Sequence, residues 1–153
     1  MGTIPTRQAL TGAKFYRKIL SFFEDYLVLP KINPSWFQLA GLLLSLGYIY
    51  LSSDITKIWF LVIILILDWL DGASARMQGK ASLSGWMIDV LIDRLSEGFI
   101  FWAEIGTSVG YIFFILWILN CILSIYSVKS GKHVILAIRF AYIFVLLYRI
   151  LWI

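Results

Sequence analysis

The sequence is poor in the residues that usually build disulfides, metal centres and hydrated surfaces. Its 153 residues include a single cysteine, Cys121, and a single histidine, His133. One cysteine cannot form an intramolecular disulfide, and a lone histidine between apolar segments favours an interfacial loop residue over a metal ligand. Charged residues make up only 14% of the chain, against roughly 25% in soluble domains.

Hydrophobic residues, in contrast, make up 61% of the chain. This composition predicts an integral membrane protein, and the length suits a single domain over residues 1–153. The formal net charge is +4, but the basic residues gather at the ends of apolar segments, which is typical of membrane orientation signals and not of a nucleic-acid surface.

The hydrophobic pattern predicts an all-α protein that begins with an amphipathic helix. Residues 13–29 mix aromatic and charged side chains at helical spacing, which favours a helix in the membrane interface. The alternative is a solvated helix packed on a partner. Asn33-Pro34-Ser35 then predicts a helix start. Five spanning helices follow in a bundle over residues 36–153, at 36–51, 57–77, 82–104, 108–127 and 133–153.

The distribution of lysine and arginine predicts the orientation of these spans. One side carries most of them: Arg7, Lys14, Arg17, Lys18, Lys31, Arg76, Lys80, Lys129 and Lys132. The other side carries Lys57 and Arg149. Because the richer side faces the cytoplasm, the N-terminus and the turn near residue 80 are expected inside the cell.

Four aspartates stand where a membrane helix would not carry them without a function. Asp68 and Asp71 share one helix face, and Asp89 and Asp93 share a face of the next helix. An ionised carboxylate in hydrocarbon needs a partner, and like charges disfavour one another. Carboxylate oxygens suit hard cations, so the pattern predicts bound Mg²⁺ or Mn²⁺, with Arg76 adding positive charge suited to a phosphate.

Two other interpretations compete with a catalytic site. The aspartates would form a structural ion network if Arg76 and Arg94 neutralised them, but two arginines cannot balance four carboxylates. They would line the path of a small cation channel or transporter if acidic residues were spread through the membrane depth. They lie at one level beside an arginine instead, which favours a closed site over a pore or a non-catalytic scaffold.

The same residues carry a family resemblance. The pattern Asp68-x2-Asp71-Gly72-x2-Ala75-Arg76-x8-Gly85-x3-Asp89-x3-Asp93 resembles the complete signature of the CDP-alcohol phosphotransferases, class I. That family usually has six spanning helices, so five is a departure. The resemblance implies a homodimeric membrane enzyme of phospholipid synthesis that transfers a substituted phosphate group from a CDP-linked lipid to a small alcohol and releases CMP.

The resemblance also implies roles for individual residues. Asp68, Asp71 and Asp89 would bind a pair of divalent metal ions, and Asp93 would share a metal contact and act as general base. The donor nucleotide and its phosphates would lie against the residues of the signature's small and basic positions and the first turn, namely Gly72, Ala75, Arg76, Gly85, Asn33 and Pro34.

The acceptor is less constrained by the sequence. The segment from Gly85 to Arg94 is similar to family members that use inositol phosphate, while serine, glycerol phosphate and other polyols stay open. A phosphorylated acceptor would suit basic residues, and the candidates are Arg139, Lys132, Lys129 and Arg94. Arg139 would otherwise extend to the interface, and Arg94 would pair with Glu97 one helical turn away.

Overall fold

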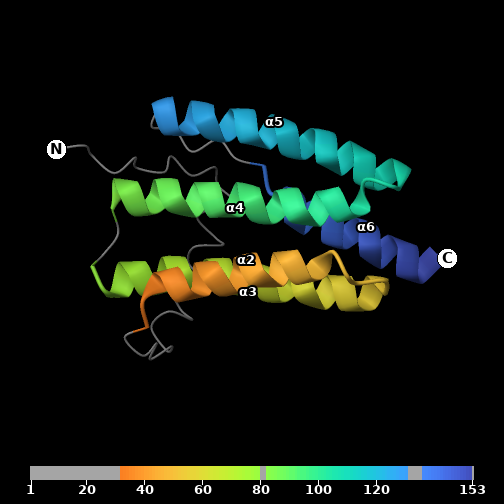
Figure 1. The fold of residues 1–153 in the computed structure, drawn as a ribbon, viewed down its shortest axis with the longest axis horizontal. Helices are drawn as coiled ribbons and strands as arrows, with labels where there is room; N and C mark the ends of the chain where they lie inside the picture. Colours follow the sequence, from red (N-terminus) through yellow and green to blue (C-terminus); the bar gives the residue numbers. More distant parts are fainter. Residues whose placement is uncertain (1–31, 80–81, 131–135, 153) are drawn as a thin grey trace.

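Five helices form the part of the protein that the computed structural model describes, which is residues 32–79, 82–130 and 136–152. They are α2 (Pro34–Tyr48), α3 (Asp54–Met77), α4 (Leu83–Glu104), α5 (Ser108–Ser130) and α6 (Ile138–Trp152). Figure 1 shows α4 between α5 and the α2–α3 pair, while α6 packs against α3 and α5. No strand is present in these residues, so the all-α prediction is confirmed for them.

The helix ends follow local capping chemistry. The Asn33 side chain accepts a hydrogen bond from the Ser35 amide at 3.3 Å, with Pro34 in the first turn of α2, as predicted. Ser82 caps α4 by accepting from the Gly85 amide at 3.0 Å. Gly79, at the turn after α3, has a φ of 62°, which glycine adopts without strain.

The predicted spans agree with these helices to within a few residues at most ends. The second and third spans were predicted to end at Met77 and Glu104, where α3 and α4 end, and the fourth to begin at Ser108, where α5 begins. The first helix ends at Tyr48, before the predicted 51, and α6 begins only at Ile138. The predicted interfacial helix at 13–29 lies outside the described residues.

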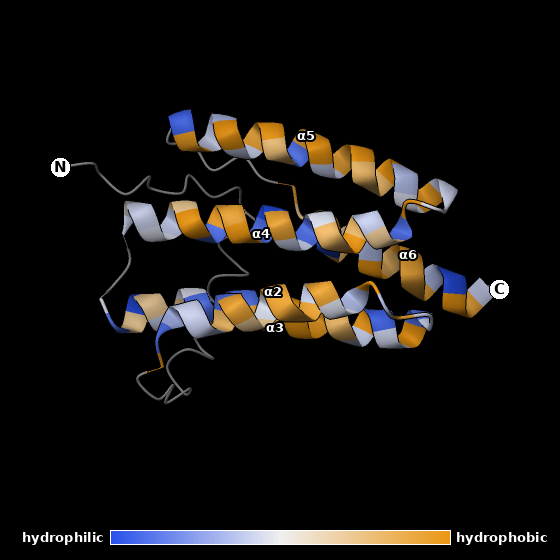
Figure 2. Cartoon of the chain, in the orientation of Figure 1, coloured by the Kyte–Doolittle hydropathy of each residue, from blue (hydrophilic) through white to orange (hydrophobic). Residues whose placement is uncertain are grey.

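The outer surface of the bundle is strongly apolar. Figure 2 shows hydrophobic residues along every helix, and large side chains such as Trp36, Trp59 and Leu151 are more than half exposed. Among the described helices, α3 and α5 are long and apolar enough to cross a membrane by themselves. Apolar side chains that face outward in this number fit a lipid environment, as expected for an integral membrane protein.

The apolar core lies toward the end of the bundle where α3 begins and α4 ends. Phe101, Phe113 and Tyr142 pack ring against ring, with centroids 4.8–5.5 Å apart, and so join α4, α5 and α6. Tyr48 from α2 is fully buried there and donates a hydrogen bond to Glu104 at 3.1 Å. Lys57 pairs with the same glutamate at 2.6 Å. This packing leaves the opposite half of the bundle for the aspartates.

Candidate functional site

The antiparallel helices α3 and α4 bring the four predicted aspartates together. Asp71 is 4% exposed, and its carboxyl group lies near that of Asp89. Asp68 and Asp93 are partly buried, with side-chain exposures of 28% and 24%, and one arginine bridges them. The four side chains therefore lie in one region of the bundle, between α3 and α4.

Arg139 of α6 is the buried cation of this site. One terminal nitrogen, Nη1, lies 2.6 Å from Oδ2 of Asp68, and the other, Nη2, donates to Oδ1 of Asp93 at 2.7 Å. Its Nε lies 3.5 Å from Oε1 of Glu97. At 5% exposed, Arg139 does not extend to the interface, so that alternative was wrong. The observed ion pairs add Arg139 to the network considered above, since Arg139 pairs with Asp68 and Asp93 while Arg94 pairs with Glu97.

Glu97 links this bridge to two further helices. Its Oε2 lies 2.7 Å from Nη1 of Arg94, which confirms the predicted pair one turn apart. The same oxygen accepts from Asn120 Nδ2 of α5 at 3.3 Å. Glu97 is 2% exposed and Asn120 is fully buried. The polar interior therefore runs continuously from the aspartates through Arg139 and Glu97 to α5.

The predicted donor-binding residues lie toward the C-terminal end of α3, at the start of α4 and at the start of α2. Gly72 lies under the Arg76 guanidinium, since a methyl group there would come within 3.2 Å of Nη1. Gly85 lies beside the capping hydroxyl of Ser82, 3.1 Å from the position a Cβ would take. Ala75 is half-buried on α3, one residue before exposed Arg76.

Asn33 and Pro34 lie close to the end of α3. The carbonyl oxygen of Ile32, just before them, accepts hydrogen bonds from Ser74 Oγ at 2.9 Å and Gln78 Nε2 at 2.6 Å. This clamp of two hydrogen bonds on the Ile32 carbonyl holds the start of α2 beside the last turn of α3, which carries Arg76. Asn33 thus has a capping role and also a position near the predicted donor site.

Helix α2 contributes two site residues that the motif did not reveal. The Gln38 side chain lies near the carboxyl group of Asp71. Gly41, one turn further along, faces Asp68, whose Oδ1 would lie 3.7 Å from an added Cβ. The spacing of Gln38, Gly41 and buried Ser45 on one otherwise apolar helix was the available signal.

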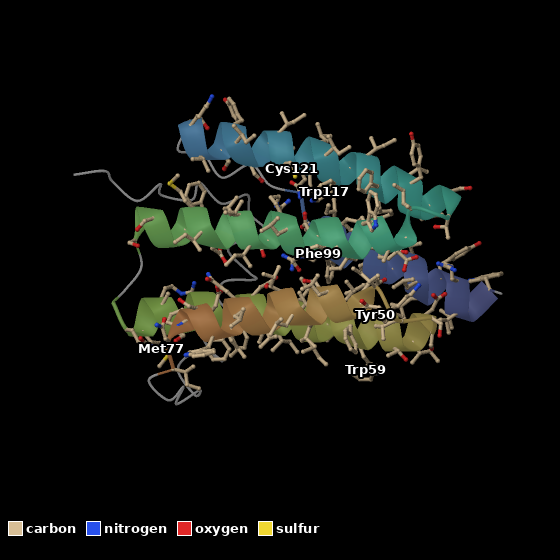
Figure 3. The ribbon with its side chains drawn as sticks, in the orientation of Figure 1. Tyr50, Trp59, Met77, Phe99, Trp117 and Cys121 are labelled. Atoms are coloured by element: carbon tan, nitrogen blue, oxygen red, sulfur yellow. The ribbon has the colours of Figure 1, made fainter. Side chains whose placement is uncertain are left out.

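The predicted acceptor residues are not gathered at one point. Arg94 is buried at 7% exposed and lies toward α5, where its carbonyl accepts from Trp117 Nε1 at 2.8 Å; Trp117 lies between α4 and α5 (Figure 3). Lys129 is exposed near the C-terminal end of α5. Lys132 lies outside the described residues. The structure brings only Arg139 into contact with the aspartates.

The residues present fit a divalent cation by their chemistry. Asp71 and Asp89 are neighbours, and two neighbouring ionised carboxylates repel each other unless a proton or cation compensates their charge. Arg139 contacts one oxygen each of Asp68 and Asp93, and the buried guanidiniums of Arg139 and Arg94 are outnumbered by the carboxylates around them. In the described part of the chain, however, no three acidic, histidine or cysteine side chains converge tightly enough to form a finished metal site.

The fold and the site together define an apolar helical bundle with a carboxylate-rich interior. The chain belongs to the CDP-alcohol phosphatidyltransferase family, whose model matches residues 31–150. The resemblance carried by the aspartate motif is therefore confirmed.

The chain is also similar to the archaetidylinositol phosphate synthase of Pyrococcus horikoshii. The two sequences are 38% identical over 82 residues, which is 52% of this chain. The matched region covers 42% of that relative's length. No solved structure matches the chain.

Proposed function

We propose that the protein is a membrane enzyme that transfers a phosphatidyl-type group from a CDP-linked lipid to inositol phosphate and releases CMP. Family membership supports the reaction class. The observation that carries the proposal is that α3 and α4 bring the motif aspartates near one another, with Asp68 and Asp93 sharing one buried arginine and Asp71 lying near Asp89. The inositol phosphate acceptor is supported by the similarity to the Pyrococcus synthase.

In this proposal, Asp68, Asp71, Asp89 and Asp93 hold one or two Mg²⁺ or Mn²⁺ ions. Such ions, when bound, neutralise the diphosphate charge of the donor and stabilise the leaving CMP. The fit rests on the oxygen-only donor set and on the excess of carboxylates over buried guanidiniums. Gln38 would hold Asp71 from the α2 side, and Arg139 would hold the facing oxygens of Asp68 and Asp93.

Asp93 is the group we assign as general base. The acceptor hydroxyl oxygen attacks the lipid-linked phosphorus, the bond from that phosphorus to the CMP oxygen breaks, and the hydroxyl proton passes to Asp93. Because Arg139 already occupies Oδ1 of Asp93, the proton would go to Oδ2. No histidine, cysteine or lysine lies on the α4 face that carries Gly85, Asp89 and Asp93.

The donor would bind at the turn between α3 and α4. Arg76, which lies over Gly72, would contact donor phosphate, and Ala75 and Gly85 would let the nucleotide approach the helix backbones. Asn33 and Pro34 would border the same space, held there by the clamp on the Ile32 carbonyl. Lys129 and Lys132, with Arg94, remain the predicted acceptor contacts.

The buried position of Arg139 argues against a cation channel. A guanidinium fixed between Asp68 and Asp93 places positive charge where a cation would have to pass.

We further propose that the site faces the cytoplasm and that all five helices cross the membrane after an interfacial helix at 13–29. We also propose that the enzyme is a homodimer with one site per protomer. Lysine and arginine distribution supports the orientation, and family membership supports the remainder.

The proposal is tested by CMP release from purified protein in liposomes. CDP-diacylglycerol and CDP-archaeol are each supplied with Mg²⁺ and, in separate reactions, inositol phosphate, serine or glycerol phosphate. Acceptor-dependent CMP release that is highest with inositol phosphate is expected. CMP release with only serine or only glycerol phosphate would show that this alcohol, and not inositol phosphate, is the acceptor. The absence of CMP release with every combination of donor and acceptor would overturn the proposed activity.

A further inference from the structure

The buried polar groups beyond the aspartates include two that the proposed chemistry does not use, Glu97 and Asn120. Both are almost fully enclosed, at 2% and 0% exposed. A buried carboxylate is costly unless its contacts repay the lost hydration. Glu97 is placed so that one oxygen meets Arg94 and Asn120 while the other faces the Nε edge of Arg139.

Asn120 fixes the helix from which Arg139 comes. Its Oδ1 accepts from the Leu136 amide at 2.9 Å, and its Nδ2 donates to the Leu136 carbonyl at 3.0 Å. These two bonds attach the chain just before α6 to the middle of α5. Since Arg139 follows Leu136 by three residues, Asn120 sets where the arginine side chain starts, and Glu97 contacts it where the guanidinium begins.

We propose that Glu97 and Asn120 are positioning residues that aim the two terminal nitrogens of Arg139 at Asp68 and Asp93. A planar guanidinium has three edges, so a contact at Nε restricts the directions of Nη1 and Nη2. Without that contact, the guanidinium would turn about its last side-chain bonds, and the two aspartates would lose their fixed separation. This inference rests on the proposed function, because the position of Arg139 matters for catalysis only if the aspartates form the active site.

Glu104 supplies a matched control for the test. It is the same residue type on the same helix, it is equally buried at 3% exposed, and it pairs with Lys57 at 2.6 Å. It lies two helical turns from Glu97, roughly 10 Å along the axis. Glu97→Gln and Glu104→Gln therefore remove the same buried charge, but only Glu97→Gln removes it from beside Arg139.

The experiment compares these variants with wild type in thermal unfolding, in Mn²⁺ binding by electron paramagnetic resonance without substrates, and in CMP release. Both variants are expected to lower the unfolding temperature. Only Glu97→Gln should weaken Mn²⁺ binding and reduce kcat, each by about 10- to 100-fold, the scale seen when a group that orients a metal ligand is lost. Glu104→Gln should stay within about twofold of wild type in both, because distant sites act independently.

Equal Mn²⁺ binding by the two variants would overturn the inference and leave Glu97 a structural residue. Adding Glu97→Gln to Arg139→Gln should cause no further loss of Mn²⁺ binding; a full additional loss would show that Glu97 does not act through Arg139. If Glu97→Gln does not fold, Asn120→Ser carries the test, and wild-type Mn²⁺ binding by that variant contradicts the proposal. Wild-type protein that binds Mn²⁺ but releases no CMP would instead contradict the proposed function alone.

Discussion

At the scale of single residues, Arg139 is the buried cation that joins the carboxylates of α3 and α4. It faces three carboxylates from two helices, those of Asp68, Asp93 and Glu97. A buried ion pair contributes little net stability when intact, because both charges lose hydration. Removing one partner is different, since it leaves the remaining charges buried without compensation.

Arg139→Gln is therefore expected to destabilise the protein by about 3–5 kcal/mol in the absence of metal. Arg149→Gln is the control, because Arg149 lies on the same helix but is 32% exposed and pairs with Asp54 at 3.3 Å. An exposed pair of that kind is worth about 0–1 kcal/mol. Chemical unfolding of both variants in the same detergent measures the difference. Equal losses would show that Arg139 is not the central counterion.

The motif predicted the carboxylates, but it could not predict their partners. Helix periodicity is local, so spacing alone placed Asp68 with Asp71 and Asp89 with Asp93. The bond between Arg139 and Asp93 joins residues 46 apart in sequence, and its existence depends on where α6 packs. The same holds for Gln38, which reaches Asp71 from α2. An apolar helix with one glutamine gives no sign of the helix it will meet.

At the scale of helices, Gly98 is one of the points where α4 and α5 approach closely. A Cβ at Gly98 would lie 2.9 Å from Cζ2 of Trp117, whose indole is held by its bond to the Arg94 carbonyl. A larger side chain would push the two helices apart or displace the indole. That displacement would also disturb Arg94 and, through it, Glu97.

Gly98→Val is expected to destabilise the protein by about 1–3 kcal/mol, the usual effect of overpacking a filled contact. Gly106→Val is the control, because an added Cβ at Gly106 meets nothing within 4 Å. Thermal unfolding followed by circular dichroism would measure the stability of both variants. An unfolding temperature for Gly98→Val equal to that of Gly106→Val would show that α4 and α5 do not need this close approach.

The positions of the helices were largely predictable from the hydrophobic runs in the sequence, and α3 and α4 end where the pattern predicted. The start of α6 was not, because no capping residue or change of composition marks Ile138. There, the side chain of Asn120 on another helix holds the preceding backbone at Leu136. An element boundary set by a distant side chain leaves no local signal.

At the scale of the whole molecule, the bundle has two ends of different chemistry. Met77 lies at the aspartate end of α3, and Tyr50 lies at the opposite end of the bundle (Figure 3). Both are exposed, at 52% and 88%. Together they form a pair of labelling positions for the orientation proposed from the basic residues.

Met77→Cys and Tyr50→Cys, each in a chain with Cys121→Ala, are expected to label from opposite sides of the membrane. A membrane-impermeant maleimide applied to intact cells should label Tyr50→Cys, whereas Met77→Cys should label only after the membrane is opened. The physical reason is the excess of lysine and arginine on the Met77 side, which is retained in the cytoplasm. Labelling of Met77→Cys in intact cells would place the site outside and refute the orientation.

The central claim is that Asp93 takes the acceptor's proton in a transfer that releases CMP. Asp93→Asn keeps the size of the side chain and an oxygen for Arg139 but removes its charge and basicity. We expect CMP release to fall by more than about 10²-fold, the scale of a general-base contribution, while CDP-lipid binding weakens much less. Asp54→Asn, an aspartate paired with Arg149 at the other end of the bundle, should keep normal release. Near-normal acceptor-dependent CMP release by Asp93→Asn would contradict the account.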